Sequence, residues 1–393
     1  MKVLVLGSRI PYPMHDGGAK ASYQLLQILN GLNHELTFFS FNTKKHFASA
    51  QILKEKFSFC RVITHDLDGS IKPYHAIRSL IAGKSYNLSR FSSASANNAL
   101  EKLLEEETFD VIHFESLFTI PFLKVVQKNH KGPLLLRQHN AENKIWDKLA
   151  KSSKGLKKGY ISVLARQLRK EEEMVLSKFN AIIGISQKDT DYFQRFNKNA
   201  SFISVAQEQH IPIPAIKPHT LCHIGSMEWQ PNVQAVEWFL DVIWDEILRL
   251  NPKAEFHIAG KSLDKMDPRF KKPNVINHGE VSDSNEFLRN NGLLVIPLQS
   301  ASGVRMKALE AMSHGIPIVS TQIGVSGLAV EHGKEVWLGD SPEEMIQGIQ
   351  LLFNGTKDAL EMGKNGWNYV HQRFSVQALT QKWNALYSEI SNQ

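Results

Sequence analysis

The sequence predicts an α/β protein with two domains, each built around a parallel β-sheet. The chain has 393 residues, a length that suits two domains of ordinary size. Short, almost wholly apolar runs recur along it, and helical patterns lie between several of these runs. Strands that are apolar at nearly every position are buried on both faces, as in parallel sheets. Helices between such strands indicate β-α-β units.

The expected strands of the first half are the runs Lys2–Gly7, Leu36–Ser40, Arg61–Asp66, Asp110–Glu115, Pro133–His139, Ala181–Ser186 and Ser201–Ala206. Those of the second half are the runs 221–226, 255–260, 275–279, 293–298, 317–321 and 335–340.

Two helix starts follow from capping residues. Asn232 precedes apolar residues at helical spacing, so we expect it to cap that helix. Ser341 is followed by Pro342 and then Glu344, the signature of a capping box.

Residues 207–219 are rich in proline and polar residues, and proline disfavours both helix and central strand. We therefore expect a linker there, between a first domain of residues 1–206 and a second domain of residues 220–374.

The composition, 42% apolar and 22% charged, is that of a soluble globular protein. No run of 18 apolar residues predicts a transmembrane helix, and we expect no signal peptide. Two cysteines are too few for a disulfide framework or a structural zinc site. A cytoplasmic location is the expectation.

Positive charge is concentrated in the first half of the chain. Residues 1–217 hold 31 Lys and Arg against 19 Asp and Glu, which suggests an anionic partner. The segment 144–170 contains nine bases and one acid, interleaved with apolar residues. It is typical of an amphipathic segment drawn to an anionic membrane surface, and an ordinary solvated face is the alternative. We expect no nucleic-acid partner, because no recognised module is present.

A glycine pair follows the first expected strand. Gly17 and Gly18 precede a helical pattern, and glycines in such a place let backbone N–H groups approach an anion at a helix N-terminus. Ligands of parallel sheets bind at the carboxyl ends of strands, where this loop must lie. A plain glycine turn is the alternative, since the dinucleotide spacing GxGxxG is missing.

The segment SGVRMKALEAMSHGIPIVST, residues 302–321, carries the strongest signal for a ligand. Gly303 and Val304 would open a helix, and Arg305 and Lys307 place two cations near its start, where an anion is already favoured. On a complete helix, these two side chains diverge by roughly 200°. Both reach one diphosphate only if residues 302–306 are still loop. Glu310 is placed to bind ribose hydroxyls, or to pair with Lys307 as a surface acid.

Two further loops hold polar residues at strand ends. Arg137, His139, Asn140 and Glu142 cluster after an expected strand, which indicates a site as readily as a structural cluster. For His113 and Glu115, at the end of a neighbouring strand, a structural role is favoured. In HIGSMEWQPN, residues 223–232, Gly225 and Ser226 can offer an N–H group and a hydroxyl to phosphate.

The 302–321 segment, together with HIGSMEWQPN and the Asp-Gly-Gly at 16–18, resembles glycosyltransferase family 4 over nearly the whole chain. The resemblance implies the GT-B fold, in which two Rossmann-like, doubly wound domains face each other across a cleft. It implies retaining, metal-independent transfer of a sugar from a UDP- or GDP-sugar, with no further cofactor. The second domain would hold the donor and the first the acceptor. A last helix, 375–393, would cross back onto the first domain.

The resemblance also implies roles for single residues. His139 would contact the transferred sugar and, with Arg305, serve catalysis. Gly17 and Gly18 would approach the donor diphosphate, and the sugar pocket would include Asp16, Arg137 and Asn140. The remaining donor contacts would come from Gly225, Ser226, Val281, Gly303, Val304, Met306, Lys307 and Glu310.

Two departures from the family pattern keep other functions open. The first acid of the family's E-x7-E motif is replaced by Ser302, and the usual Arg and Lys are absent from GSMEWQPN. Arg305 and Lys307 would replace them electrostatically. A catalytically weak partner subunit, a nucleotide-sugar epimerase and a membrane-surface binding protein are the alternatives.

The acceptor is expected to be a saccharide or a lipid-linked saccharide in cell-surface polysaccharide or glycolipid synthesis. The sequence does not fix the sugar, the nucleotide, the linkage or the oligomeric state.

Overall fold

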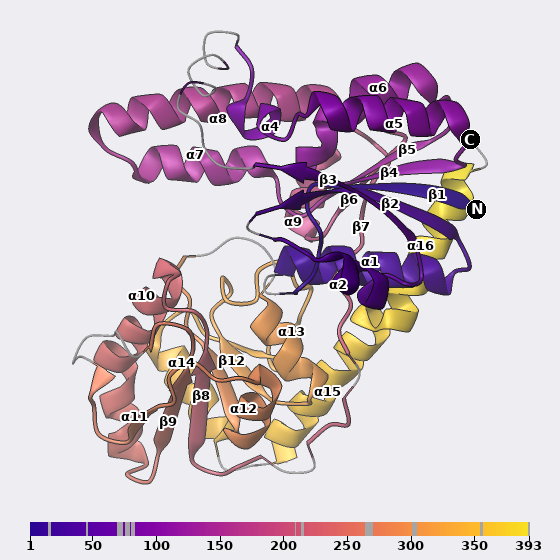
Figure 1. The fold of residues 1–393 in the computed structure, drawn as a ribbon. Helices are drawn as coiled ribbons and strands as arrows, with labels where there is room; N and C mark the ends of the chain where they lie inside the picture. Colours follow the sequence, from indigo (N-terminus) through magenta and orange to yellow (C-terminus); the bar gives the residue numbers. More distant parts are fainter. Residues whose placement is uncertain are drawn as a thin grey trace. The chain divides into compact units, whose positions relative to one another are not determined.

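A computed structural model describes residues 1–14, 17–44, 46–68, 74, 79, 83–208, 210–213, 216–263, 270–300, 305–353 and 357–391. The chain divides into two compact units (Figure 1). Unit 1 comprises Met1–Ala206 and Leu379–Gln393, and unit 2 comprises Gln207–Ala378. Each unit holds one parallel sheet, so the predicted fold class, with two Rossmann-like sheets, is confirmed.

The sheet of unit 1 has seven strands in the order β3-β2-β1-β4-β5-β6-β7, all paired in parallel. The order reverses direction between β1 and β4, the switch point at which such sheets bind ligands. The strands are β1 (Lys2–Gly7), β2 (Glu35–Thr43), β3 (Arg61–Leu67), β4 (Val111–Glu115), β5 (Leu134–Gln138), β6 (Ala181–Gly184) and β7 (Ala200–Phe202).

Helices cover both faces of this sheet (Figure 1). In β1, Val3 and Val5 belong to a core shared with α1 and α16, whereas Leu4 and Leu6 belong to a core shared with α5, α6 and α8. This explains the unbroken apolar run of the strand, because alternate side chains enter opposite cores. The helices are α1 (Gly17–Gly31), α2 (Ala50–Lys56), α4 (Tyr86–Ser89), α5 (Ala94–Glu106), the 3-10 helix η1 (Leu117–Phe122), α6 (Leu123–Asn129), α7 (Glu142–Ser152), α8 (Gly155–Leu176), α9 (Gln187–Phe193) and α16 (Val376–Ser391).

Unit 2 repeats the architecture with six parallel strands in the order β10-β9-β8-β11-β12-β13. Its strands are β8 (Thr220–Ile224), β9 (Glu255–Ala259), β10 (Val275–Asn277), β11 (Leu293–Ile296), β12 (Ile318–Ser320) and β13 (Trp337–Leu338). Its helices are α10 (Gln230–Trp238), the π-helical segment η2 (Phe239–Trp244), α11 (Asp245–Leu250), α12 (Ser284–Asn290), α13 (Met306–Ser313), α14 (Pro342–Leu352) and α15 (Lys357–Phe374).

Of the two predicted helix starts, one is confirmed and one is wrong. Ser341 caps α14 in a complete capping box with Glu344, and Pro342 is the first helical residue. Asn232 lies inside α10, which begins at Gln230. Its side chain reaches out of the helix, donating from Nδ2 to the Ser226 carbonyl at 2.9 Å. Its Oδ1, the acceptor that capping would use, instead accepts a hydrogen bond from Lys307 Nζ at 3.1 Å.

The segment 207–219, predicted as a linker, is bonded to the rest of unit 2 at several of its described residues. The Gln207 N–H donates to the Phe374 carbonyl, and the Ile213 N–H donates to the His314 carbonyl. Trp367 donates from Nε1 to the His210 carbonyl at 2.7 Å. These bonds satisfy backbone groups that a free linker would leave to water.

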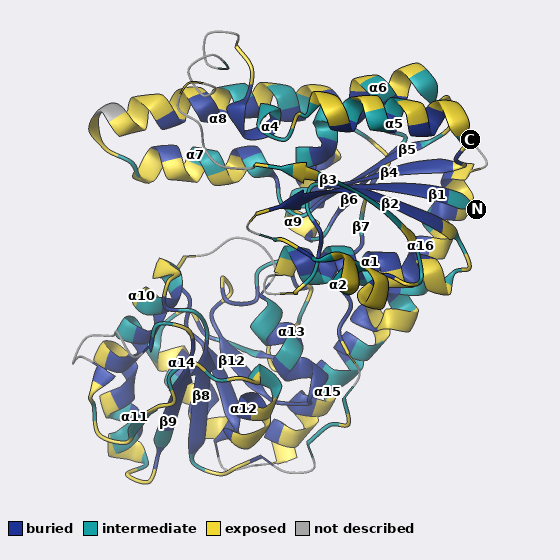
Figure 2. Cartoon of the chain, viewed as in Figure 1, coloured by how far each residue is buried: buried dark blue, intermediate teal, exposed yellow. Residues whose placement is uncertain are grey.

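The basic segment 144–170 folds into α7 and the first part of α8, two packed helices that extend beyond the sheet (Figure 1). Its apolar residues divide between two environments (Figure 2). Those in the core or packed against it are Trp146, Ile161, Leu164 and Leu168. The exposed ones are Ile145, Leu149, Tyr160 and Val163. Leu156 has no described side chain.

Candidate functional site

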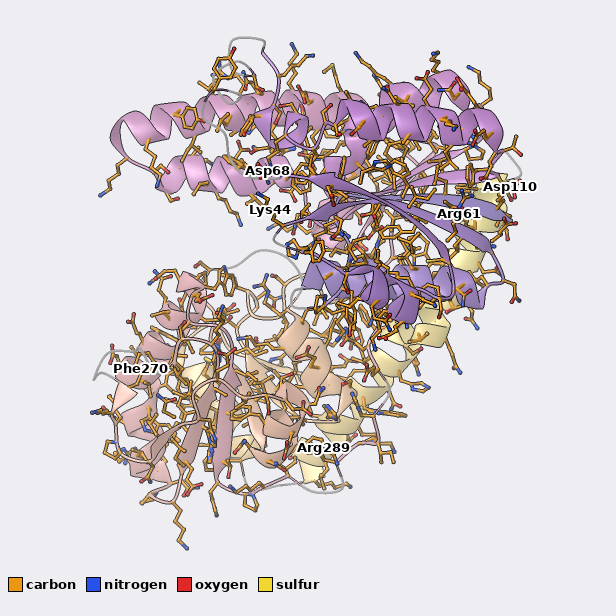
Figure 3. The ribbon with its side chains drawn as sticks, in the orientation of Figure 1. Lys44, Arg61, Asp68, Asp110, Phe270 and Arg289 are labelled. Atoms are coloured by element: carbon orange, nitrogen blue, oxygen red, sulfur yellow. The ribbon has the colours of Figure 1, made fainter. Side chains whose placement is uncertain are left out.

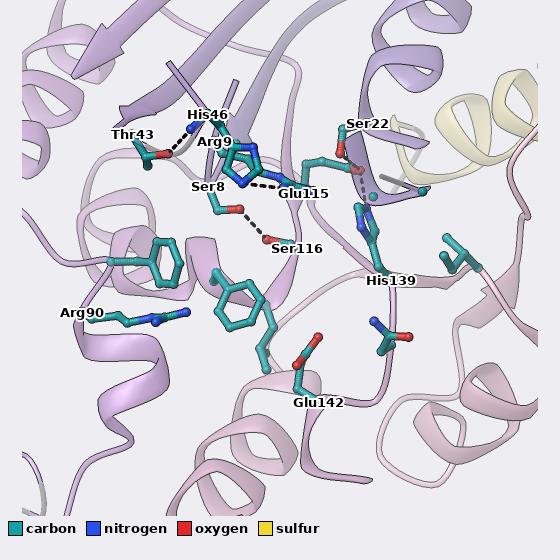
Figure 4. Close-up of a pocket in the computed structure, with 18 of the residues that line it drawn as sticks. Ser8, Arg9, Ser22, Thr43, His46, Arg90, Glu115, Ser116, His139 and Glu142 are labelled. Carbon is teal, nitrogen blue, oxygen red and sulfur yellow. Dashed lines mark hydrogen bonds and ion pairs between the residues drawn. The ribbon is translucent and has the colours of Figure 1, made fainter. Parts of the chain in front are cut away.

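A pocket of about 860 Å³ lies in unit 1 at the carboxyl ends of β1, β2, β4 and β5 (Figure 4). Its volume is typical of small-molecule sites, which span roughly 300–1,000 Å³. The position is the switch point between β1 and β4. Several predicted site residues line it, namely Gly17, Gly18, His139 and Asn140. Asp16 lies outside the described residues.

Glu115 is the centre of a charged network at the base of this pocket. Its Oε1 accepts hydrogen bonds from Ser22 Oγ and His139 Nε2, each at 2.8 Å, and from Arg137 Nη1 at 3.1 Å. His113 Nε2 lies 3.3 Å from the other carboxylate oxygen. Burial by itself would raise the pKa of Glu115, but Arg137 and the two histidines hold it well below the usual value. Glu115 is therefore ionised at neutral pH.

The ionised carboxylate fixes the protonation pattern of His139. A carboxylate only accepts hydrogen bonds, so His139 Nε2 must be the donor. In the neutral imidazole, Nδ1 then carries the lone pair and is free to accept from a ligand hydroxyl. His139 thus combines a fixed orientation with an available acceptor, as a sugar-contacting group requires.

Arg137 does not line the pocket but lies beneath it. Its side chain is only 2% exposed. Besides the bond to Glu115, it donates from Nη1 to the Ala21 carbonyl at 3.0 Å, and its guanidinium carbon lies 5.5 Å from the ring centre of Trp383. Its place in the structure is that of a residue that positions Glu115 and α1, not one that touches a ligand.

A Cβ added at Gly17 would meet no atom within 4 Å. Packing within the chain therefore does not demand glycine at this position. The small residue leaves open space beside the pocket, where a backbone N–H group at the start of α1 can be approached.

Sequence reasoning passed over several residues of the pocket. It favoured a structural role for Glu115, and it did not consider Arg9, His46 or Arg90. Glu115 and Arg137 stand opposite each other in the register of β4 and β5. Opposite charges at the ends of two consecutive apolar strands were the available signal. Arg90 follows the short helix α4, and no local pattern indicates that its side chain reaches this sheet edge.

A second cluster of predicted residues lies in unit 2, where β8 and β11 end side by side. Lys307, in the first turn of α13, donates from Nζ to His223 Nε2 at 3.2 Å and to Asn232 Oδ1 at 3.1 Å. His223 Nδ1 lies 2.9 Å from the Val295 carbonyl oxygen, so Nδ1 carries the proton and Nε2 accepts. Burial, with Lys307 nearby, keeps the pKa of His223 well below its ordinary value, so this ring is neutral.

Lys307 is therefore a partly buried amine whose direct partners are uncharged. Burial lowers its pKa to about 7, and the charge of Arg305 acts in the same direction. It does not pair with Glu310, the surface arrangement considered from the sequence, because its bonds go to His223 and Asn232. An anion bound beside this amine would favour the charged form.

Gly225 allows Lys307 to approach the loop after β8. A Cβ added at Gly225 would lie 2.8 Å from Lys307 Nζ and 2.5 Å from Asn232 Nδ2, so a larger residue would push both away. Arg305, which caps α13, reaches the far end of the same loop, with its guanidinium carbon 5.0 Å from the ring centre of Trp229. Both cations, at the start of α13, thus approach one loop, 225–229, an arrangement compatible with binding of a single diphosphate.

The other predicted donor contacts are less closely grouped. Met306 is the first residue of α13, and its N–H belongs to the unsatisfied donors of a helix start. Glu310 lies one turn further along and interacts electrostatically with Lys307. Val281 follows β10, two strands away from β8 in the sheet. Gly303 and Val304 lie outside the described residues, as does Ser302.

Within the described part of the chain, no group of three or more His, Cys, Asp or Glu residues is arranged to hold a metal ion. No described helix is both long and apolar enough to span a bilayer.

Comparison with protein families identifies the second unit. Residues 218–355 match the family model of the glycosyl transferases group 1. This match agrees with the resemblance to a glycosyltransferase family that the sequence suggested.

Relatives extend the similarity over the whole chain. The chain is 21% identical to an uncharacterized 44.6 kDa protein in the cps region of Klebsiella pneumoniae, over 95% of this chain and 96% of the relative. Among solved structures it resembles Anabaena HepE in complex with UDP and glucose, with 14% identity, a TM-score of 0.63 and 99% of each chain covered.

It also resembles a mutant S. aureus TarM in complex with fondaparinux, alpha-GlcNAc-glycerol and UDP, with 13% identity, a TM-score of 0.66, and 98% of this chain and 100% of that chain covered. A third is the sucrose-phosphate synthase of Thermosynechococcus elongatus, with 14% identity, a TM-score of 0.66 and 99% of each chain covered. The fold is that of these GT-B proteins.

Proposed function

We propose that this protein is a retaining glycosyltransferase that transfers a sugar from a UDP- or GDP-sugar to a hydroxyl of an acceptor. The observation that carries the proposal is the pair Arg305 and Lys307 at the start of α13, whose side chains approach the loop 225–229 of unit 2. Among the described residues, the hydrogen-bond partners of the Lys307 amine are the uncharged His223 and Asn232, and the first N–H groups of α13 are free of intrahelical partners. A diphosphate supplies the anion that this arrangement favours. UDP in the HepE and TarM complexes supports a nucleotide donor.

In the proposed reaction, the acceptor oxygen bonds to the anomeric carbon as the bond from that carbon to the donor phosphate breaks. The electron pair goes to the diphosphate, and the proton of the acceptor hydroxyl goes to the same leaving group. Arg305 and Lys307 stabilise the charge that develops on the diphosphate, which is electrostatic catalysis. These cations take the role that a metal ion has in other transferases, so we propose metal-independent transfer without a further cofactor. Attack from the face that the leaving group vacates retains the anomeric configuration.

Unit 1 supplies the acceptor side of the proposal. His139, oriented by Glu115, faces the pocket and is proposed to contact the transferred sugar. Gly17 leaves space for a ligand at the start of α1. The cps-region relative supports a role in synthesis of a surface polysaccharide or glycolipid. We place the activity in the cytoplasm, on the inner face of the membrane.

A donor screen tests the proposal. UDP, GDP and their common sugars are added to the full chain, and binding is followed by thermal shift. Donors that bind are then supplied with saccharide acceptors, with and without EDTA, and the anomeric configuration of the product is read by NMR. We expect stabilisation by one nucleotide, EDTA-resistant turnover and retention.

Arg305→Ala is expected to lose donor binding, whereas Arg289→Ala, on the exposed side of α12 (Figure 3), is expected to keep it. Unchanged donor turnover by Arg305→Ala would refute the proposed site. A sugar epimerised without an acceptor would instead select an epimerase, and weak donor binding with tight binding to another transferase would select a partner subunit.

A further inference from the structure

The far wall of the unit 1 pocket carries a cation without an ion-pair partner among the described residues. Arg90 follows α4, and its guanidinium points into the pocket (Figure 4). Its Nε is buried without a hydrogen-bond acceptor. Glu142 is a carboxyl whose charge Arg90 senses, but the two form no ion pair. A buried N–H donor without an acceptor is unfavourable, so a ligand acceptor would stabilise this guanidinium.

The acids that line the pocket do not supply the missing anion. Glu115 is already engaged by Arg137 and His139. Burial raises the pKa of Glu142 to about 7, so this carboxyl is largely uncharged below neutral pH. Asp68 is exposed and follows β3, so it lies at the rim of the pocket (Figure 3).

Arg90 is also held in a geometry that leaves its donors available. Its guanidinium carbon lies 4.9 Å from the ring centre of Phe91, and Phe91 lies against Phe118 with ring centres 5.0 Å apart. A guanidinium that packs on a ring face keeps its N–H edge free to bind a carboxylate or a phosphate through two hydrogen bonds. The two rings add an apolar surface on which a sugar ring can pack.

We propose that this pocket selects an acceptor saccharide that carries an anionic group, a carboxylate or a phosphate, which Arg90 binds. Phe91 and Phe118 contact the sugar ring, and Glu142 with Asn140 faces its hydroxyls. This inference rests on the proposed function, because it names the class of acceptor for the same transfer.

The test compares three probes on the full chain by calorimetric titration: methyl glucuronide, glucose 6-phosphate and the uncharged methyl glucoside. We expect at least one anionic probe to bind about tenfold tighter than the glucoside, because a charge-assisted pair replaces an unpaired cation. Preference for the glucuronide identifies a carboxylate, and preference for the phosphate identifies a phosphate group. Equal affinity for all three probes overturns the proposal.

Variants show where the probes bind. Arg90→Met is expected to remove the preference for an anionic probe over methyl glucoside. Arg90→Lys is expected to keep part of this preference. Arg195→Met, an exposed position of unit 1, is the control for charge alone and is expected to change nothing. Lys307→Met is expected to keep the preference, because Lys307 belongs to unit 2. An Arg90→Met protein with unchanged melting temperature and unchanged preference contradicts the inference.

Failure of this inference can be told apart from failure of the proposed function. UDP and GDP binding is measured in the same samples by thermal shift. Arg90-dependent binding of an anionic sugar without any nucleotide binding supports the pocket and refutes glycosyl transfer. Donor turnover with an uncharged acceptor at the same rate in Arg90→Met and the unmodified chain leaves the transferase in place and refutes the anionic acceptor.

Discussion

At the scale of single residues, the two candidate sites handle charge in opposite ways. Glu115 in unit 1 is deeply buried but surrounded by Arg137 and histidines, so its charge is satisfied within the protein. Lys307 in unit 2 is partly buried, and its hydrogen-bond partners His223 and Asn232 are uncharged. A bound anion would therefore stabilise the positive charge of its amine. The first arrangement positions a side chain, and the second is suited to binding a ligand.

The pKa of Lys307 leads to a prediction about pH. In the unfolded chain this lysine titrates near 10.5, whereas in the folded chain its pKa is about 7. Between these values the folded protein binds fewer protons than the unfolded one, so this group makes stability rise as pH rises from 7 to 10.5. Binding of a diphosphate favours the protonated amine. Nucleotide binding is therefore expected to take up a proton above pH 7 and to weaken as pH rises.

Titration calorimetry with the bound nucleotide in buffers of different ionisation enthalpy measures this proton uptake. Lys307→Met is expected to bind several-fold more weakly at pH 6 and to lose the pH dependence between 7 and 9. Lys253→Met, an exposed lysine of unit 2, serves as the control. A Lys307→Met protein that retains both affinity and proton uptake would show that another group titrates.

The residue scale also shows what local patterns can reveal. Arg305, Lys307 and Gly225 were predicted as site residues because cations and glycines at a helix start or strand end have a direct physical meaning. The role of Asn232 was misread, because a capping residue and a residue that reaches another loop look alike in sequence. Arg90 was not found because its approach to the pocket depends on tertiary packing alone.

At the scale of elements, α7 and α8 form the most distinctive addition to the unit 1 sheet. Trp146, Ile161 and Leu168 serve the core, while Ile145 and Tyr160 remain exposed among lysines (Figure 2). Arg169 pairs with Asp147 across the two helices. The sequence alone offered a membrane-binding face and an ordinary solvated face as alternatives. We propose the first alternative, in which the exposed apolar residues and the bases would contact an anionic lipid surface.

We expect the full chain to bind vesicles that contain anionic lipid and not vesicles of neutral lipid, with binding that weakens in high salt. Replacing Lys157 and Lys158, both exposed at the start of α8, by glutamate is expected to reduce binding at least tenfold, at about 1 kcal/mol per base. Sedimentation with vesicles measures this. The double change Lys253→Glu and Lys271→Glu on unit 2 is the matched control. Equal losses in both variants would show that only total charge matters.

At the scale of the whole molecule, the last helix joins a unit that is not its neighbour in sequence. Residues from Leu379 onward belong to unit 1, although the preceding 172 residues, Gln207–Ala378, form unit 2. Trp383 and Tyr387 of α16 are 1% and 0% exposed in the unit 1 core, and Tyr387 Oη lies 2.7 Å from His113 Nδ1. The C-terminal helix therefore supports the network around Glu115.

A chain that ends at Ala378 is expected to lose the fold of unit 1 and to retain that of unit 2. Removal of each large buried aromatic costs about 3–5 kcal/mol, and two such losses approach the whole stability of a typical domain. Scanning calorimetry should show that the unfolding transition of unit 1 has a lower melting temperature or is absent. The transition of unit 2, which the nucleotide stabilises, should be preserved. Tyr387→Phe, which removes one hydroxyl, is expected to lower stability by only about 1 kcal/mol. An unchanged unit 1 transition in the shortened chain would contradict this assignment of α16.

The sequence by itself determined the α/β class, the strands and the polar residues at strand ends, because burial on both faces produces unbroken apolar runs and because cations at a helix start have few other causes. Only the tertiary structure decided that Glu115 links Arg137 to His139, that Lys307 reaches the loop after β8, and that Arg90 enters the pocket. These contacts join residues that are 22 or more positions apart, and local patterns do not encode the register or packing that brings such residues together.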